Sequence, residues 1–323
     1  MDIILNTSLF LAGLVVLIFG SSCLIQSSVK LGHIFKLTPL FIGLVIVGFG
    51  TSAPEAGTSI VAAVRGYKEI ALGNIIGSCI ANIGLVLGFC AFFFPLAVNK
   101  NIFKRELPIM LLAVGFVYLL ALDLVLSRID GFILLSFFAT FLFLAYKGAK
   151  THSLEFSELK SLANFKFKKI FKRINSKFAV GMSSILSLGL VVLGANLMVR
   201  SGVALAKILG VSPRIIAITV FAIGTSLPEL TTSLAASLKK IPSISVGNIV
   251  GSNIFNILFI LGIVPLIGPI NITSSALRFE FPILFLFSAS LFAVMRTKYK
   301  ITRKEGLVMF LGYLIFIFFL VRR

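Results

Sequence analysis

Two glutamates, Glu55 and Glu229, stand apart because each lies well inside an apolar segment. The chain holds 11 Asp and Glu residues, and the other nine fall in or beside polar connections. A carboxylate within a membrane helix costs about 2.5–3.5 kcal/mol on the lenient insertion scale, so its default interpretation is a functional site. The alternative is a protonated Glu that hydrogen-bonds two helices together, and it explains one such residue better than two.

Each glutamate ends a hexapeptide of the form G-T-S-x-P-E. The proline removes a backbone donor and frees carbonyls about one turn earlier, and in lipid these must line a cavity or meet a ligand. The Thr and Ser lie four and three residues before the Glu and share its helix face. Oxygen ligands of this kind suit Ca²⁺, Na⁺ or Mg²⁺ rather than zinc or copper. The candidate ligands are Gly50, Thr51, Ser52 and Glu55, and Gly224, Thr225, Ser226 and Glu229.

The apolar segment after each hexapeptide carries polar residues at i, i+4 and i+8, on one helical face. We expect the two deeper positions to complete the cation site, whereas the first position is as well explained by a structural role. The alternative for all of them is hydrogen bonding between helices, worth about 0.6–2 kcal/mol per contact. The deeper positions are Ser78, Asn82, Ser252 and Asn256, and the first positions are Asn74 and Asn248.

Charge balance constrains what such a site can carry. Two carboxylates give it a charge of −2, which one Ca²⁺, two Na⁺ or two protons would neutralise. One oxygen cage can therefore hold Ca²⁺ or monovalent ions in competition, as an antiporter requires. A further bound Na⁺ would leave the loaded site positive and make exchange electrogenic, and composition alone does not decide between these cases.

The two motifs belong to an internal repeat. Residues 50–88 align without a gap onto residues 224–262, with 19 of 39 positions identical. The shared positions include Gly, Pro, Asn, Ser, Thr and Glu, which chance similarity between two greasy segments would not match. We therefore infer an internal duplication.

Composition identifies the elements that must position these residues. The chain has 323 residues, of which 58% are hydrophobic and only 13% charged, against about 25% charged in a typical soluble domain. Several apolar runs reach the roughly 20 residues that cross a bilayer. We predict an all-α polytopic membrane protein with ten spans, at 8–28, 38–64, 70–94, 107–126, 130–147, 179–206, 213–238, 245–267, 278–295 and 305–321.

Five spans lie on each side of one polar segment, residues 148–178. The predicted units are residues 1–147, with the first repeat at about 38–94, and residues 179–323, with the second at about 213–267. Because five is odd, the two copies must cross the membrane in opposite directions. This inverted-topology repeat is common in secondary transporters, whose sites form near the midplane from discontinuous helices.

The net charge of +19 comes from Lys and Arg that cluster between the apolar runs. We read them as topology-setting loop charges and expect no nucleic-acid partner. Alternate connections hold 21 Lys and Arg on one side and eight on the other, which predicts a cytoplasmic 148–178 loop and both termini outside. Within that loop, apolar residues at helical spacing among lysines at 166–174 suggest either a helix on an anionic membrane surface or an ordinary basic loop.

The repeats resemble those of the sodium/calcium exchangers in the cation/Ca²⁺ antiporter family. The resemblance rests on G-T-S-A-P-E…G-N-I-I-G-S-C-I-A-N and G-T-S-L-P-E…G-N-I-V-G-S-N-I-F-N, about 80 residues together. It implies that Glu55 and Glu229 coordinate Ca²⁺ and Na⁺, helped by the Thr, Ser and Asn positions named above. It also implies that spans 1 and 6 form a mobile bundle that slides past the ion-binding core.

Two departures narrow this implication. Some family members carry Asp at one of the positions of Asn82 and Asn256, so two amides here weaken the case for K⁺-dependent exchange. The 148–178 loop is also too short for the calcium-sensing domains of animal exchangers.

The sequence thus predicts a Na⁺/Ca²⁺ antiporter of the cytoplasmic (inner) membrane. It predicts membrane lipid as its surroundings, no cofactor and no obligate protein partner. A proton-coupled Ca²⁺ or other divalent-cation antiporter is the alternative, and a cation channel is less favoured. An enzyme is least favoured, because the only histidines, His33 and His152, lie in connections and leave either glutamate without a general-base partner.

Overall fold

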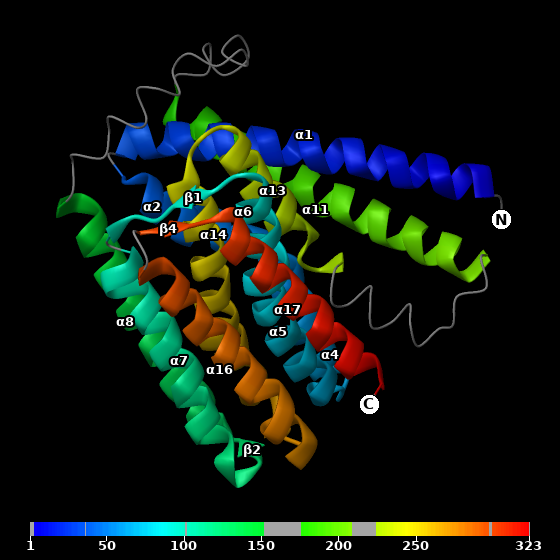
Figure 1. Cartoon of the computed structure of the whole chain (residues 1–323), viewed down its shortest axis with the longest axis vertical. Coiled ribbons are helices and arrows are strands. Elements are labelled where there is room, and N and C mark those ends of the chain that lie inside the picture. The colour runs from blue at the N-terminus through cyan, green and yellow to red at the C-terminus, as the bar shows by residue number, and fades with distance from the viewer. Residues whose placement is uncertain are drawn as a thin grey trace.

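The computed structural model describes residues 3–35, 37–100, 102–151, 176–208, 224–296 and 299–322. In these ranges the chain is helical, with four strands of two residues each (Figure 1). The first half comprises α1 (Ile3–Phe35), α2 (Pro39–Phe41), η1 (Ile42–Val47), α3 (Gly48–Thr51), α4 (Ala53–Val64), α5 (Lys68–Ala81), η2 (Asn82–Leu87), α6 (Gly88–Phe93), β1 (Leu96–Ala97), η3 (Ile102–Glu106), α7 (Leu107–Leu120), η4 (Ala121–Asp123), β2 (Val125–Leu126) and α8 (Arg128–Thr151).

The second half follows the same order over the described residues. It comprises α11 (Lys177–Ile208), α13 (Leu227–Leu238), α14 (Pro242–Ile254), η7 (Phe255–Ile260), α15 (Leu261–Ile267), β3 (Ile270–Asn271), α16 (Ser274–Arg296), β4 (Lys300–Ile301) and α17 (Arg303–Arg322).

Seven described helices are long and apolar enough to cross a membrane, and they coincide with the predicted spans 1, 3, 4, 5, 6, 8 and 9. The predicted span 2 is a bent pair, Ile42–Thr51 and Ala53–Val64, which meet at 45°. The predicted span 10 is covered by α17, and the predicted span 7 lies partly outside the described residues, with α13 as its described part. The described chain is thus mostly helical, with seven helices long and apolar enough to cross a membrane. The count of ten spans in two repeats stays a prediction.

Two spans form the centre of the molecule. In Lys68–Phe93 and Pro242–Ile267, 78% and 83% of an apolar stretch of 18 residues is buried inside the protein, against 28–39% of the equivalent stretch in the other five spans. These central spans hold the two G-N-x-x-G-S motifs, which explains why their polar residues face protein rather than lipid.

The two halves interlock around this centre. A Cβ built on Gly131 of α8 would lie 2.6 Å from the carbonyl oxygen of Gly262 in α15, so these backbones touch. In the same way Gly306 of α17 lies against Gly88 of α6. Each contact joins one half to the other, and small residues permit such close helix approach.

Short strands also connect the halves. β1 pairs with β4, and β2 pairs with β3, both antiparallel. Figure 1 shows the β1–β4 pair and β2 at opposite ends of α7 and α16. Helices α8 and α17 begin directly after strands with matching capping boxes, in which Asp130 accepts from Ser127 and Glu305 accepts from Thr302.

Helices α1 and α11 lie side by side and cross the other spans obliquely (Figure 1). With 33 and 32 residues, each is roughly 50 Å long at 1.5 Å per residue, so it must tilt to fit a bilayer core of about 30 Å. Their contact is close: a Cβ on Gly194 would lie 2.5 Å from the backbone nitrogen of Leu17.

Polar contacts tie α1 to α13. The hydroxyl of Ser21 lies 2.9 Å from that of Thr231. The ammonium of Lys239, just after α13, donates to the carbonyl and hydroxyl oxygens of Ser22 at 2.7 and 2.8 Å.

Candidate cation site

The site begins where two helices start deep inside the protein. Pro54 and Pro228 occupy the first turns of α4 and α13, and Glu55 and Glu229 follow them directly. Proline suits the first turn because the amide it lacks would have no helical partner there. Both glutamate side chains are fully buried. Each carboxylate therefore sits at a helix N-terminus, where the helix dipole favours negative charge.

Side chains from both halves converge on these two helix starts. Ser52 donates to Glu229 Oε1 at 2.8 Å, and Ser252 reaches the same oxygen at 3.5 Å. The hydroxyls of Ser78 and Thr225 lie 3.2 Å apart. Two predicted ligands thus bond to Glu229, Ser252 from its own half and Ser52 from the other. The Ser78–Thr225 pair is a separate contact between the halves.

Several buried oxygens of this cluster have no hydrogen-bond partner. They are both carboxylate oxygens of Glu55, Oε2 of Glu229, Oδ1 of Asn82, Oδ1 of Asn256 and the hydroxyl of Ser226. Buried polar atoms are nearly always hydrogen-bonded, and each exception calls for an explanation. A cation explains this set, because carboxylate, carboxamide and hydroxyl oxygens are all hard ligands.

The described residues contain no group of three or more His, Cys, Asp or Glu suited to a metal ion. The cluster has two carboxylates, and its other oxygens are neutral.

The first positions of the i, i+4, i+8 faces make structural contacts. Asn74 donates to the hydroxyls of Thr58 and Ser59 at 3.2 and 3.0 Å. Asn248 donates to Ser233 at 2.9 Å, and its oxygen accepts from Thr51 at 3.0 Å. Thr51 is therefore engaged by an amide in this structure.

The remaining predicted ligands lie at the edge of the cluster. Gly50 and Gly224 are half-buried near the helix starts, and Gly50 packs against Leu188 of α11. The carbonyl that accepts from Ser252, at 3.0 Å, belongs to Gly48 rather than Gly50. The assignment of all twelve positions as ligands stays a prediction.

Sequence reasoning missed Asn253. This residue is fully buried in α14 and bonds to Asn82 and to the backbone of Cys79. Its counterpart in the first half is Cys79, so Asn253 is not among the residues that the two repeats share.

The π-helical segments η2 and η7 begin at or just before Asn82 and Asn256. Such segments, with hydrogen bonds between residues five apart, often occur at functional sites. No signal in the composition marked them.

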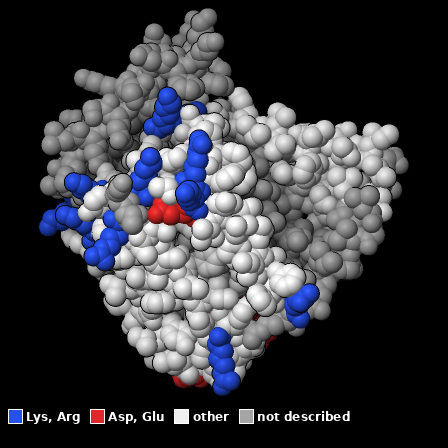
Figure 2. Space-filling view, viewed as in Figure 1, with Lys and Arg blue, Asp and Glu red and all other residues white. Residues whose placement is uncertain are grey.

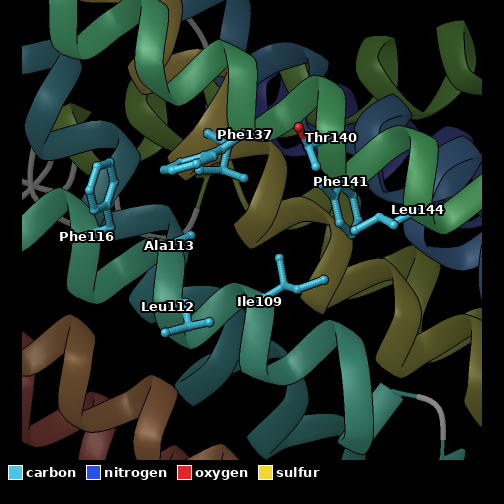
Figure 3. A pocket seen from close by; sticks show the side chains of 9 residues that line it. Ile109, Leu112, Ala113, Phe116, Phe137, Thr140, Phe141 and Leu144 are labelled. Atoms are coloured by element: carbon cyan, nitrogen blue, oxygen red, sulfur yellow. The ribbon is translucent and has the colours of Figure 1, made fainter.

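An apolar pocket between α7 and α8 is separate from this cluster (Figure 3). Its lining includes Phe116, Phe137 and Phe141. The hydroxyl of Thr140 in the lining donates to the carbonyl of Ser136. The pocket offers no charged ligand, so we do not assign it to the cation.

Comparisons with known proteins show which family this chain resembles. The family model of the sodium/calcium exchanger protein matches residues 5–147 and 181–322. A putative antiporter, CaxA of Alkalimonas amylolytica, is 34% identical over 313 residues, which is 95% of this chain and 97% of that protein. The sodium/calcium exchanger MaX1 of Methanosarcina acetivorans is 30% identical and covers 98% of each chain.

A solved structure is also similar. The sodium-calcium exchanger NCX_Mj superposes with a TM-score of 0.82 at 32% identity, over 97% of this chain and 98% of that one. The resemblance inferred from the two hexapeptide motifs is confirmed: the chain belongs to the sodium/calcium exchanger family.

Proposed function

We propose that this member of a cation/Ca²⁺ antiporter family exchanges Ca²⁺ for Na⁺ by alternating access at the cluster around Glu55 and Glu229. The observation that carries the proposal is the set of buried oxygens without partners on both glutamates and on Asn82 and Asn256. Two buried carboxylates are too costly to hold uncompensated, so the transported cations supply the missing charge.

Competition for one site supports exchange. A −2 site is neutralised by one Ca²⁺ or by two Na⁺, so loading one ion displaces the other. Flexible oxygen cages accept Ca²⁺ with six to eight ligands, and hydroxyl and carboxamide oxygens serve Na⁺ equally well. The relatives named as sodium/calcium exchangers favour Na⁺ as the coupling ion.

Proton coupling is the second candidate. Two protons would neutralise the pair of carboxylates as well as two Na⁺, and the relative CaxA carries the broader name of antiporter.

We also propose that the basic end of the molecule faces the cytoplasm. Figure 2 shows Lys and Arg gathered at the end that holds β4. Lys300, Arg303 and Lys304 lie in and after β4, and Lys104 and Arg105 lie in η3. Positive charge at one end of the spans favours that orientation, with both termini outside. The predicted surface helix at 166–174 lies outside the described residues.

The test is radioactive Ca²⁺ uptake into proteoliposomes that contain the full chain. An outward Na⁺ gradient should drive uptake, and a pH gradient should not. Glu55→Gln and Glu229→Gln should each lower the uptake at least tenfold. Glu69→Gln is the control, because it makes the same change on an exposed residue of α5.

Uptake that followed the pH gradient and ignored Na⁺ would refute sodium coupling and leave the site intact. Unchanged uptake in both inner Gln variants would instead refute the site.

A further inference from the structure

We propose that Asn253 is a positioning residue that fixes the carboxamide of Asn82 with its oxygen available to the cation. The inference rests on the proposed function, since it concerns a ligand of the same site. Asn253 comes from the second half and Asn82 from the first, and both side chains are fully buried.

The orientation is set by a backbone carbonyl. The carbonyl of Cys79 can only accept, and it accepts from Nδ2 of Asn253 at 3.1 Å. The oxygen of Asn253 is therefore turned the other way, toward Asn82. It accepts from Nδ2 of Asn82 at 3.0 Å. The oxygen and nitrogen of a carboxamide are told apart by such partners. Because the Cys79 carbonyl can only accept, both hydrogen bonds in this series have a single possible direction.

These hydrogen bonds fix the direction of the Asn82 oxygen, Oδ1. Because its amide nitrogen is engaged by Asn253, the oxygen must point away from that residue. It is buried and has no hydrogen-bond partner. Asn82 lies one turn after Ser78 on the same helix face, and Ser78 contacts Thr225 in the second hexapeptide. An acceptor held in this way is a preformed ligand, which avoids an ordering cost when the ion binds.

The other half has a thiol in place of the orienting amide. The counterpart of Asn253 is Cys79, and the counterpart of Asn82 is Asn256. Neither the oxygen nor the nitrogen of the Asn256 side chain is hydrogen-bonded to another amide, and the neighbour of Asn256 at the equivalent place is the thiol of Cys79. The two amides therefore differ: Asn82 is held as an acceptor, and the orientation of Asn256 is not set by a neighbouring amide.

The test measures Ca²⁺ affinity by the Ca²⁺-dependent shift in the melting temperature of the purified full chain. Asn253→Cys places in the second half the residue that the first half carries. It removes the amide that orients Asn82, and we expect Ca²⁺ affinity to weaken about tenfold, equivalent to the loss of roughly one hydrogen bond to a charged group. Asn253→Ser is the second variant in case Asn253→Cys does not fold.

A double-mutant cycle separates positioning from stability. If Asn253 acts through Asn82, then Asn82→Ala alone and Asn82→Ala with Asn253→Cys should have the same Ca²⁺ affinity. A general structural role would make the two losses add. Asn74→Cys is the matched control, because it changes a buried Asn that bonds to Thr58 and Ser59. It should lower the melting temperature and leave Ca²⁺ affinity unchanged.

Additive losses, or an unchanged affinity in both Asn253 variants, would overturn the proposal. Glu55→Gln measured alongside distinguishes this failure from failure of the proposed function. If Glu55→Gln abolishes the Ca²⁺ shift while the cycle is additive, the site stands and only the role of Asn253 falls. If Glu55→Gln also keeps its full Ca²⁺ affinity, the proposed site itself is wrong.

Discussion

Replacing Gly251 by Ala should push α14 and η1 apart. Gly251 is buried in α14, directly before Ser252. A Cβ built on it would lie 2.1 Å from the carbonyl oxygen of Leu44 and 2.7 Å from the carbonyl carbon. Leu44 belongs to η1, the segment that leads to the first hexapeptide. The obstacle is backbone, so no side-chain rotation can relieve it.

The size of the effect follows from these distances. Carbon approaches a carbonyl oxygen to about 3.3 Å, so α14 and η1 must move apart by roughly 1 Å. Overpacking of a core costs about 1–3 kcal/mol and occasionally more, and a backbone clash belongs at the upper end. The same movement draws Ser252 away from the carbonyl of Gly48, now 3.0 Å from its hydroxyl. Ca²⁺ holds its oxygens at about 2.3–2.6 Å, so a ligand displaced by roughly 1 Å is lost.

We therefore expect Gly251→Ala to lower both the melting temperature and the Ca²⁺ affinity, the latter about tenfold. The assays are thermal unfolding with and without Ca²⁺ and Na⁺-driven Ca²⁺ uptake in proteoliposomes. Gly73→Ala is the control, because Gly73 occupies the other motif, is exposed, and has no described atom within 4 Å of its added Cβ. If the two variants behaved alike, the close contact between α14 and η1 would be refuted.

Three further predictions concern other parts of the molecule. Lys239→Met removes the two hydrogen bonds to Ser22 and should destabilise the protein by about 1–3 kcal/mol. Lys240→Met, at an exposed position, should leave the stability unchanged. Equal melting temperatures of the two variants would contradict the link between α1 and α13. Ca²⁺ at about 100 times its dissociation constant should stabilise the chain by roughly 2.7 kcal/mol, and Glu229→Gln should abolish that gain, so a retained shift would remove Glu229 from the site. Lys160 belongs to the 148–178 segment, which the sequence predicts to be cytoplasmic, so Lys160→Cys should react with an impermeant thiol reagent only from the cytoplasmic side. Labelling from outside would refute the proposed orientation.

Much of the architecture was accessible from the sequence because it depends on long patterns. Apolar runs of about 20 residues predict spans without knowledge of their neighbours. The duplicated hexapeptides paired Glu55 with Glu229 before any contact was known, and the structure places both at buried helix starts.

The missing parts depend on differences between the halves. Asn253 escaped notice because its position in the first half is Cys79, and its contact with Asn82 joins residues 171 positions apart. The repeat also predicts equal roles for equivalent serines, yet Ser52 bonds to Glu229 while the hydroxyl of Ser226 has no partner. An identity-based comparison cannot show which of two equal residues is engaged in a given conformation.

The two strand pairs bear on how the molecule can move. Each pair joins the halves by backbone hydrogen bonds, and the bonds from Val98 to Tyr299 and from Ile272 to Leu124, both 2.8 Å, extend them. Rocking one half against the other would break both pairs at once. Helices α1 and α11 lie outside these pairings and contact each other most extensively. We expect the paired segments to retain their amide protons in hydrogen exchange throughout a transport cycle, while exchange at the surface between the α1–α11 pair and the remaining helices changes with the bound ion.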